Sequence, residues 1–142
     1  MAKRYFFNEK DRIAYLKYIK YYSIKYKLII WAYSLMNNHI HFVVIPEKED
    51  SMARTFSIAH MIYAQDINQK RKNKGHLWQG RFYSRPMDER HTYVAIKYIE
   101  QNPVRAGLAE KSRERKRTSA AYHIGGEDIF GILQKSPILP CF

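Results

Sequence analysis

Two apolar runs separated by a pair of asparagines constrain the fold of this chain more than any other stretch. The first run covers residues 28–35, and the second covers residues 39–45 and is ended by Pro46. Asparagine tolerates the left-handed backbone conformation that tight turns need, so Asn37-Asn38 predicts a turn. The stretch therefore predicts an antiparallel hairpin, whose apolar faces must be covered by the rest of the chain.

Regular spacing of apolar residues predicts a helix on each side of this hairpin. Residues 9–26 carry large apolar and tyrosine side chains at intervals of three and four positions, which places them on one helix face. The same spacing recurs from Met52 to Ile67. We expect Asp50 or Ser51 to cap this second helix and Gly75 to end it.

A short mixed segment and a third helical pattern follow. We predict a strand around residues 80–86, a cap at Asp88, and a helix from Glu89 to about Gln101 that Asn102-Pro103 ends. The order helix, hairpin, helix, strand, helix predicts an α+β fold in which helices pack on an antiparallel sheet.

Length, charge and cysteine content narrow the functional classes. The 142 residues suit one domain, which we place at residues 1–125, with a tail at residues 126–142. The formal net charge of +12 favours a polyanionic partner such as nucleic acid, with a generally basic soluble protein as the alternative. The one cysteine, Cys141, allows no internal disulfide, and no segment has the pattern of a signal peptide or membrane span. We therefore expect a cytoplasmic, nucleoid-associated protein with no membrane partner.

His39 and His41 open the second strand of the hairpin with one apolar residue between them. Side chains alternate along a strand, so both imidazoles are expected on the same face of the sheet. Such a pair suits a metal ion or a phosphate group, or is simply half exposed. A metal site needs a third ligand, which no cysteine supplies.

The third helix offers a third ligand and a nucleophile. Tyr98 and Asn102 are four positions apart, so they share a helix face. An amide oxygen suits Mg²⁺ or Mn²⁺, and Mn²⁺ also tolerates imidazole. Tyrosine is a weak nucleophile at neutral pH, so attack on a phosphodiester would need a cation beside the phosphate. Because the chain has 12 tyrosines, a purely structural role is the alternative.

Three motifs, in this order and spacing, resemble a known family. Residues 38–44 (Asn-His-Ile-His-Phe-Val-Val) resemble the His-hydrophobic-His (HUH) motif of single-strand DNA endonucleases. Residues 76–82 (His-Leu-Trp-Gln-Gly-Arg-Phe) and 98–108 (Tyr-Ile-Glu-Gln-Asn-Pro-Val-Arg-Ala-Gly-Leu) resemble the REP-associated tyrosine transposases, relatives of the single-tyrosine insertion-sequence transposases. The resemblance covers about residues 5–125.

The resemblance implies a ferredoxin-like HUH endonuclease fold and a defined chemistry. Members nick single-stranded DNA beside a hairpin with the help of a divalent metal, Mg or Mn. Carried over to this chain, His39, His41 and Asn102 are the metal ligands and Tyr98 is the nucleophile. The tyrosine forms a 5′-phosphotyrosine link and frees a 3′-OH, and a later step rejoins the strand.

The resemblance also implies a role in DNA binding for the basic and aromatic residues. Cations are expected to contact the DNA backbone, and aromatic rings are expected to stack on unpaired bases. The candidates are Lys70, Arg71, Lys72, Lys74, Trp78, Arg81, Phe82, Arg85 and Arg105. Trp78 is equally suited to a core position.

The chain departs from the family pattern at its start. Family members usually carry a further strand before the segment that matches Phe6-Phe7, whereas only about five residues precede it here. We therefore expect an unpaired sheet edge beside the histidine strand. The interpretations are a truncated start, a homodimer whose partner fills the gap, or a copy that binds hairpin DNA without cleaving it. A third functional class, a phosphoesterase with His39 as nucleophile, is less favoured.

Overall fold

The computed structural model describes residues 4–36, 39–72, 75, 77–78, 84–100, 119 and 133. Within these residues the elements follow the order α1 (Glu9–Lys25), β1 (Leu28–Leu35), β2 (Ile40–Pro46), α2 (Ser51–Arg71) and α3 (Glu89–Glu100). The predicted α+β class is confirmed, as are the hairpin and the helices predicted before and after it.

The hairpin is antiparallel and closes through a short connection. β1 and β2 pair from Leu28 and Pro46 to Leu35 and Ile40. The Met36 N–H then donates to the His39 carbonyl at 2.9 Å, which closes a two-residue loop. Asn37 and Asn38, the predicted turn residues, lie outside the described residues.

A β-bulge at Trp31 changes which side chains of β1 face the core. Ile30 pairs with Val44 and Ala32 pairs with Val43, so Trp31 is an extra residue in β1. Strict alternation would place Ile30 and Tyr33 on opposite faces of the strand. Because of the bulge, both are buried in the same core.

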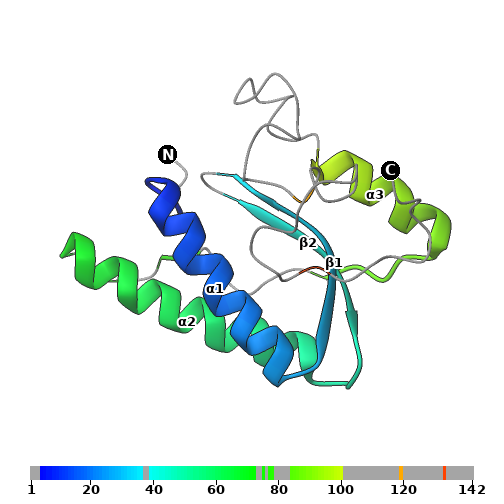
Figure 1. The fold of residues 1–142 in the computed structure, drawn as a ribbon, viewed down its shortest axis with the longest axis horizontal. Coiled ribbons are helices and arrows are strands. Elements are labelled where there is room, and N and C mark those ends of the chain that lie inside the picture. The colour runs from blue at the N-terminus through cyan, green and yellow to red at the C-terminus, as the bar shows by residue number, and fades with distance from the viewer. Residues whose placement is uncertain are drawn as a thin grey trace.

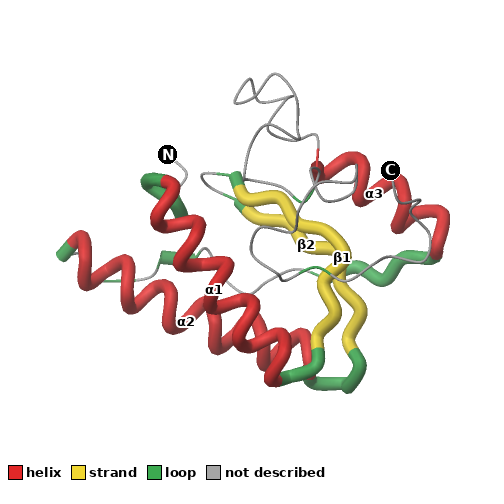
Figure 2. The backbone as a smooth tube through the Cα atoms, viewed as in Figure 1, coloured by secondary structure: helices red, strands yellow, loops and turns green. Residues whose placement is uncertain are grey.

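The hairpin lies between two helical layers (Figure 1, Figure 2). α1 and α2 cover one face, where aromatic and aliphatic side chains such as Tyr15 and Tyr63 form the larger core. α3 covers the other face, where Ile96 and Ile99 pack against Ala32 and Val43. Successive residues of β2 therefore face different helical layers.

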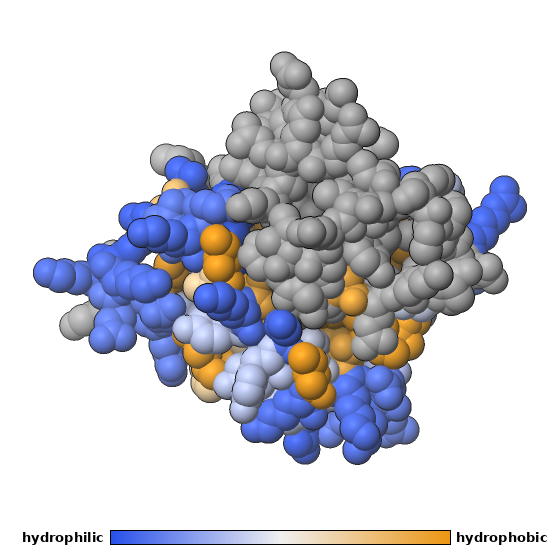
Figure 3. Space-filling model, viewed as in Figure 1, coloured by the Kyte–Doolittle hydropathy of each residue, from blue (hydrophilic) through white to orange (hydrophobic). Residues whose placement is uncertain are grey.

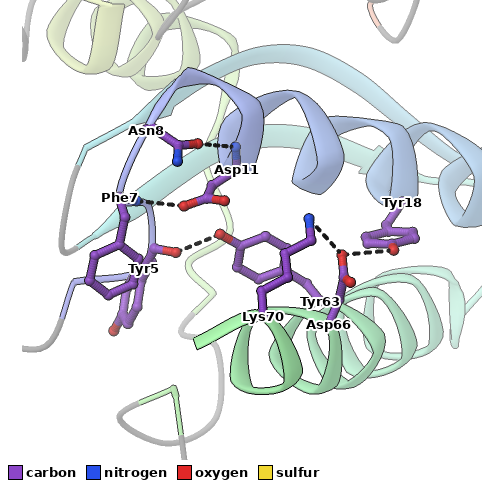
Figure 4. Close-up of polar contacts among 8 residues, drawn as sticks. All are labelled: Tyr5, Phe7, Asn8, Asp11, Tyr18, Tyr63, Asp66 and Lys70. Carbon is purple, nitrogen blue, oxygen red and sulfur yellow. Dashed lines mark hydrogen bonds and ion pairs between the residues drawn. The ribbon is translucent and has the colours of Figure 1, made fainter. Parts of the chain in front are cut away.

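Local hydrogen bonds fix the start of α1. Asn8 is the N-cap, as its residue type predicts, and its Oδ1 accepts from the Asp11 N–H at 3.0 Å. Asp11 Oδ2 in turn accepts from the Phe7 N–H at 2.8 Å (Figure 4). The two bonds resemble a capping box, except that Asp11 bonds the N–H of Phe7, one residue before the N-cap.

Polar contacts link α2 to α1 and to the segment before α1 (Figure 4). Tyr63 Oη donates to the Tyr5 carbonyl at 2.5 Å, which ties α2 to the segment before α1. Asp66 accepts from Tyr18 Oη at 3.2 Å and lies 3.6 Å from Lys70 Nζ. Burial of the Tyr63 ring, followed by the nearby Asp11 carboxylate, raises the pKa of its phenol.

The ends of α2 differ from the sequence-based expectation. Asp50 occupies the N-cap position, but its side chain makes no capping hydrogen bond and instead pairs with Arg54 at 2.8 Å. The helix ends at Arg71, before the predicted stop at Gly75. Lys72 adopts the left-handed conformation with φ 55°, and its N–H bonds to the last carbonyls of the helix. Asn68 Nδ2 then bonds to the Gly75 carbonyl at 3.0 Å.

The predicted strand around residues 80–86 is wrong for its described part. Residues 84–86 form no strand, and their side chains are exposed. Pro86 also lacks the N–H that a ladder needs. Residues 80–83 lie outside the described residues. Asp88 caps α3 as predicted, since its Oδ1 accepts from the His91 N–H at 2.8 Å.

Two isolated residues of the C-terminal part cover the outer edge of β1. Ser119 exchanges hydrogen bonds with Tyr33: its N–H donates to the Tyr33 carbonyl at 3.1 Å, and its Oγ accepts from the Tyr33 N–H at 2.9 Å. Leu133 forms a parallel bridge with Ile30. The edge of β1 that faces away from β2 is therefore partly paired.

Hydrophilic and hydrophobic residues are unevenly distributed over the surface. In Figure 3, hydrophilic side chains gather at the left, over the C-terminal end of α2.

No helix in the described part of the chain combines the length and the apolar composition that crossing a bilayer requires.

Candidate functional site

The two histidines of the motif lie side by side at the start of β2. Their ring centroids are 5.2 Å apart, with the rings at 70° to each other. Both side chains are exposed. The alternation along β2 places His41 on the same face as Val43, which is the face that α3 covers. The closeness of the two rings agrees with the prediction that both imidazoles lie on one face of the sheet.

The surroundings of His41 favour its neutral imidazole. Desolvation by its surroundings, with a further contribution from the neighbouring His39, lowers the pKa of His41 below its ordinary value of 6.5. A neutral imidazole keeps the lone pair that a metal ligand must offer. The lowered pKa of His41 is therefore compatible with the predicted role of this residue as a metal ligand.

A groove of about 780 Å³ contains this pair and follows the outer edge of β2. Its walls come from both sides of the sheet, because His41 and Val43 face α3 whereas Phe42 and Val44 face α2. Further lining residues come from α2 (Met52, Phe56, His60), from α3 (Thr92, Ala95, Ile99) and from the segment between them (Ser84, Arg85, Pro86, Met87). Among the described residues β2 pairs with β1 only. That the other edge of β2 is unpaired in the whole chain stays a prediction.

The predicted nucleophile borders this groove but does not line it. Tyr98 is 61% exposed, on the outer side of α3, and it is absent from the groove wall. It lies one turn after Ala95, which does line the groove, and residues three apart are neighbours on a helix surface. The structure therefore places Tyr98 at the rim and the histidines inside.

The third predicted metal ligand, Asn102, lies outside the described residues. Among those that are described, no group of three or more His, Cys, Asp or Glu side chains could hold a metal ion. An amide ligand would not belong to such a group. His39 and His41 thus lie close together, and their role as metal ligands, together with Asn102, stays a prediction.

The predicted DNA contacts fall into two regions. Lys70, Arg71 and Lys72 lie exposed at the C-terminal end of α2, where cations are favoured by the helix dipole. Arg71 also stacks on the Phe7 ring, 3.4 Å from its centroid. Arg85 is exposed and lines the groove. Lys74, Arg81, Phe82 and Arg105 lie outside the described residues.

Trp78 is held by packing contacts. Its ring stacks on His60 with centroids 4.2 Å apart, and it also contacts Tyr5 at 4.5 Å. Its Nε1 donates to the His60 carbonyl at 2.9 Å. These contacts occupy both the ring and its polar atom, which favours the core alternative for this residue.

His60 is a polar residue of the groove that sequence reasoning did not single out. Its Nε2 lies 2.7 Å from Tyr15 Oη, and burial lowers the pKa of His60 to about 4. Burial also raises the pKa of the Tyr15 phenol well above its ordinary value, so the tyrosine is the donor. The sequence signal for this pair is only that both residues fall on the inner stripes of their helices.

Comparisons with known proteins agree with the motif order. The family model described as "Transposase IS200 like" matches residues 1–102. A solved structure of a REP-associated tyrosine transposase bound to a REP hairpin matches with a TM-score of 0.63 and 16% sequence identity. The alignment covers 93% of this chain and 81% of that one. No curated protein sequence matches the chain. The HUH transposase fold is therefore shown, and the chain belongs to the IS200-like transposase family.

Proposed function

We propose that this protein is a metal-dependent endonuclease and strand transferase that acts on single-stranded DNA beside a hairpin. The observation that carries the proposal is the position of α3. It covers the same face of the hairpin that presents His41, and it brings Tyr98 to the rim of the groove that contains the histidine pair.

The reaction requires one bond to form and one to break. Tyr98 Oη attacks the phosphorus, and the bond from phosphorus to the 3′ oxygen breaks. The products are a 5′-phosphotyrosine and a free 3′-OH. The phenolic proton goes to solvent, and the departing oxygen takes a proton from solvent. Attack by that 3′-OH on the phosphotyrosine reverses the step and rejoins a strand.

His39, His41 and Asn102 would hold the divalent metal, Mg or Mn. Such an ion would neutralise charge on the scissile phosphate. The low pKa of His41 keeps its imidazole neutral, and so able to coordinate, at neutral pH.

The basic residues would hold the DNA. The C-terminal end of α2 offers Lys70, Arg71 and Lys72 to phosphates, and Arg85 offers its guanidinium inside the groove. Lys74, Arg81, Phe82 and Arg105 are proposed to add further contacts, with Trp78 holding the groove wall. Dimerisation and a cytoplasmic, nucleoid-associated location also stay predictions.

A second candidate is a hairpin-binding protein without cleavage. The exposure of Tyr98 outside the groove favours it, because a nucleophile should reach the phosphate next to the metal. The endonuclease proposal therefore requires the DNA strand to cross the rim of the groove, so that its phosphate reaches both Tyr98 and the histidine pair.

One experiment separates the two candidates. The protein is incubated with hairpin-bearing single-stranded DNA and Mn²⁺, and a denaturing gel shows cleaved strand and covalent adduct. The proposal predicts adduct with the wild type and with Tyr93→Phe, a matched exposed tyrosine on α3, but none with Tyr98→Phe. Tight, salt-dependent binding with no adduct would support the binding protein instead.

A further inference from the structure

The last residue of α3 is a buried carboxylate. Glu100 is only 4% exposed, and it stands at the C-terminal end of the helix. A negative charge at that end is disfavoured by the helix dipole, and burial of a carboxylate adds a desolvation cost. Helix formation and apolar packing therefore do not explain why Glu100 is buried here. The explanation must lie in the polar contacts of its carboxylate.

Ser119 provides a contact that fixes this carboxylate. Ser119 is 2% exposed, and its Oγ donates a short hydrogen bond to Glu100 Oε2. The same Oγ accepts from the Tyr33 N–H at 2.9 Å, while the Ser119 N–H donates to the Tyr33 carbonyl at 3.1 Å. The hydroxyl has one proton, and a carboxylate is a stronger acceptor for it than the Tyr33 carbonyl at 3.4 Å.

Tyr33, the residue of β1 that bonds to Ser119, lies close to His41 in the sheet. Tyr33 is paired with Phe42, and the next residue, Ser34, is paired with His41. The end of α3 is thus fastened to the main chain of β1 one residue away from the partner of His41. Elsewhere along α3, Ile96 and Ile99 pack against the sheet through apolar contacts.

We propose that Glu100 is a positioning residue. Through Ser119 it fastens the end of α3 to β1 and so sets the rotation and height of Tyr98 relative to the histidine pair. Apolar contacts alone are non-directional and permit a helix to slide or rotate, whereas a hydrogen-bonded anchor does not. Glu100 is two residues after Tyr98, about 200° around the helix, so the fixed position of Glu100 also fixes the position of Tyr98 at the groove rim. This inference rests on the proposed endonuclease function.

The test measures cleavage and helix mobility separately. Single-turnover adduct formation with hairpin DNA and Mn²⁺ is measured for the wild type, Glu100→Ala, Ser119→Ala, the double variant and Glu100→Gln. We expect Glu100→Ala and Ser119→Ala each to slow adduct formation by about tenfold or more, since small misplacements of a reacting group are costly. The DNA dissociation constant should be unchanged. The double variant should be no slower than either single variant, because both remove one anchor. Glu100→Gln, which retains an acceptor for Ser119, should recover most of the rate.

Amide hydrogen exchange of the α3 peptide gives a reading that does not depend on activity. Exchange in the last turn should be faster in Ser119→Ala and near the wild-type rate in Glu100→Gln. Wild-type adduct rates in both alanine variants would overturn the positioning role. Absence of a Tyr98-dependent adduct in the wild type would overturn the proposed function. Hydrogen exchange would then still test the Glu100–Ser119 anchor, and unchanged exchange in Ser119→Ala would overturn the anchor as well.

Discussion

Ser34 lies directly opposite His41 across the hairpin, and its Oγ is fully buried with no hydrogen-bond partner among the described residues. Cross-strand neighbours on one face have Cβ atoms within about 5.5 Å of each other. A metal-bound histidine usually donates its second ring N–H to a polar neighbour. The buried hydroxyl is therefore a cost in the protein alone, and it would be well placed to accept a hydrogen bond from His41 if the proposed metal binds.

The Ser34 hydroxyl gives a first prediction about stability. Ser34→Ala removes a buried, unsatisfied polar group, so the free energy of unfolding should be unchanged or higher, by up to about 1–3 kcal/mol. Ser23→Ala is the matched control, because that hydroxyl is also buried but donates to the Lys20 carbonyl at 3.0 Å. Urea denaturation of the metal-free proteins gives both values. A clear loss of stability in Ser34→Ala, larger than in Ser23→Ala, would mean that Ser34 is satisfied.

His60 should make stability depend on pH. Its pKa is about 4 in the folded protein and 6.5 ordinarily, so between these values the unfolded chain binds a proton that the folded chain does not. Stability is therefore full above pH 6.5 and falls as the pH is lowered towards 4. By pH 4.5 the loss should be about 2 kcal/mol.

The matched variant isolates this residue from the other acid-sensitive groups. His60→Gln keeps an acceptor for Tyr15 and cannot titrate, so its stability relative to the wild type should rise as the pH falls from 7 to 4.5. Urea denaturation at both pH values measures the difference. An identical pH dependence in the two proteins would show that His60 is accessible to protons in the folded state.

Metal binding should depend on the motif histidines. His39→Ala and His41→Ala should each weaken Mn²⁺ binding strongly, while His91→Ala, an exposed histidine on α3, should leave it unchanged. Because the pKa of His41 is lowered, protons compete for it only below its ordinary value of 6.5, and affinity should fall as the pH drops through that region. Isothermal titration calorimetry at several pH values measures the Mn²⁺ affinity of each protein. Equal Mn²⁺ affinity in the His41→Ala and wild-type proteins would place the metal elsewhere.

Arg85 should contribute one phosphate contact from inside the groove. Arg85→Gln should weaken hairpin DNA binding and reduce the slope of log affinity against log salt by about 1. Lys17→Gln removes an equal charge from the exposed surface of α1 and should alter neither quantity appreciably. Fluorescence anisotropy at several salt concentrations separates the two variants. If both variants reduce the slope equally, DNA contacts the protein through diffuse charge and not through the groove.

Much of the fold follows from local patterns. The hairpin is predicted by its two apolar runs and turn residues. α1 is predicted by apolar spacing, and α3 by its helical pattern together with the cap at Asp88. The Trp31 bulge is not predictable, because it depends on which side chains fit the core between α1 and α2. The end of α2 was misplaced because Lys72, a residue that rarely takes positive φ, ends the helix before Gly75.

The candidate site was predictable only where motif residues are close in sequence. His39 and His41 share a face because a strand alternates, and this needs no tertiary information. The Glu100, Ser119 and Tyr33 contact joins residues up to 86 positions apart, and it depends on a buried hydrogen bond that no spacing reveals. The exposure of Tyr98 likewise depends on how α3 is rotated over the sheet.

The most direct test of the central claim is the chemical identity of the protein–DNA link. After reaction with hairpin-bearing single-stranded DNA and Mn²⁺, the adduct is digested with nuclease and protease and the peptides are sequenced by mass spectrometry. The account predicts a 5′-phosphate, with its residual nucleotide, on the oxygen of Tyr98 and a free 3′-OH on the released strand. A phosphate carried by His39, by another tyrosine, or by no residue at all would contradict it.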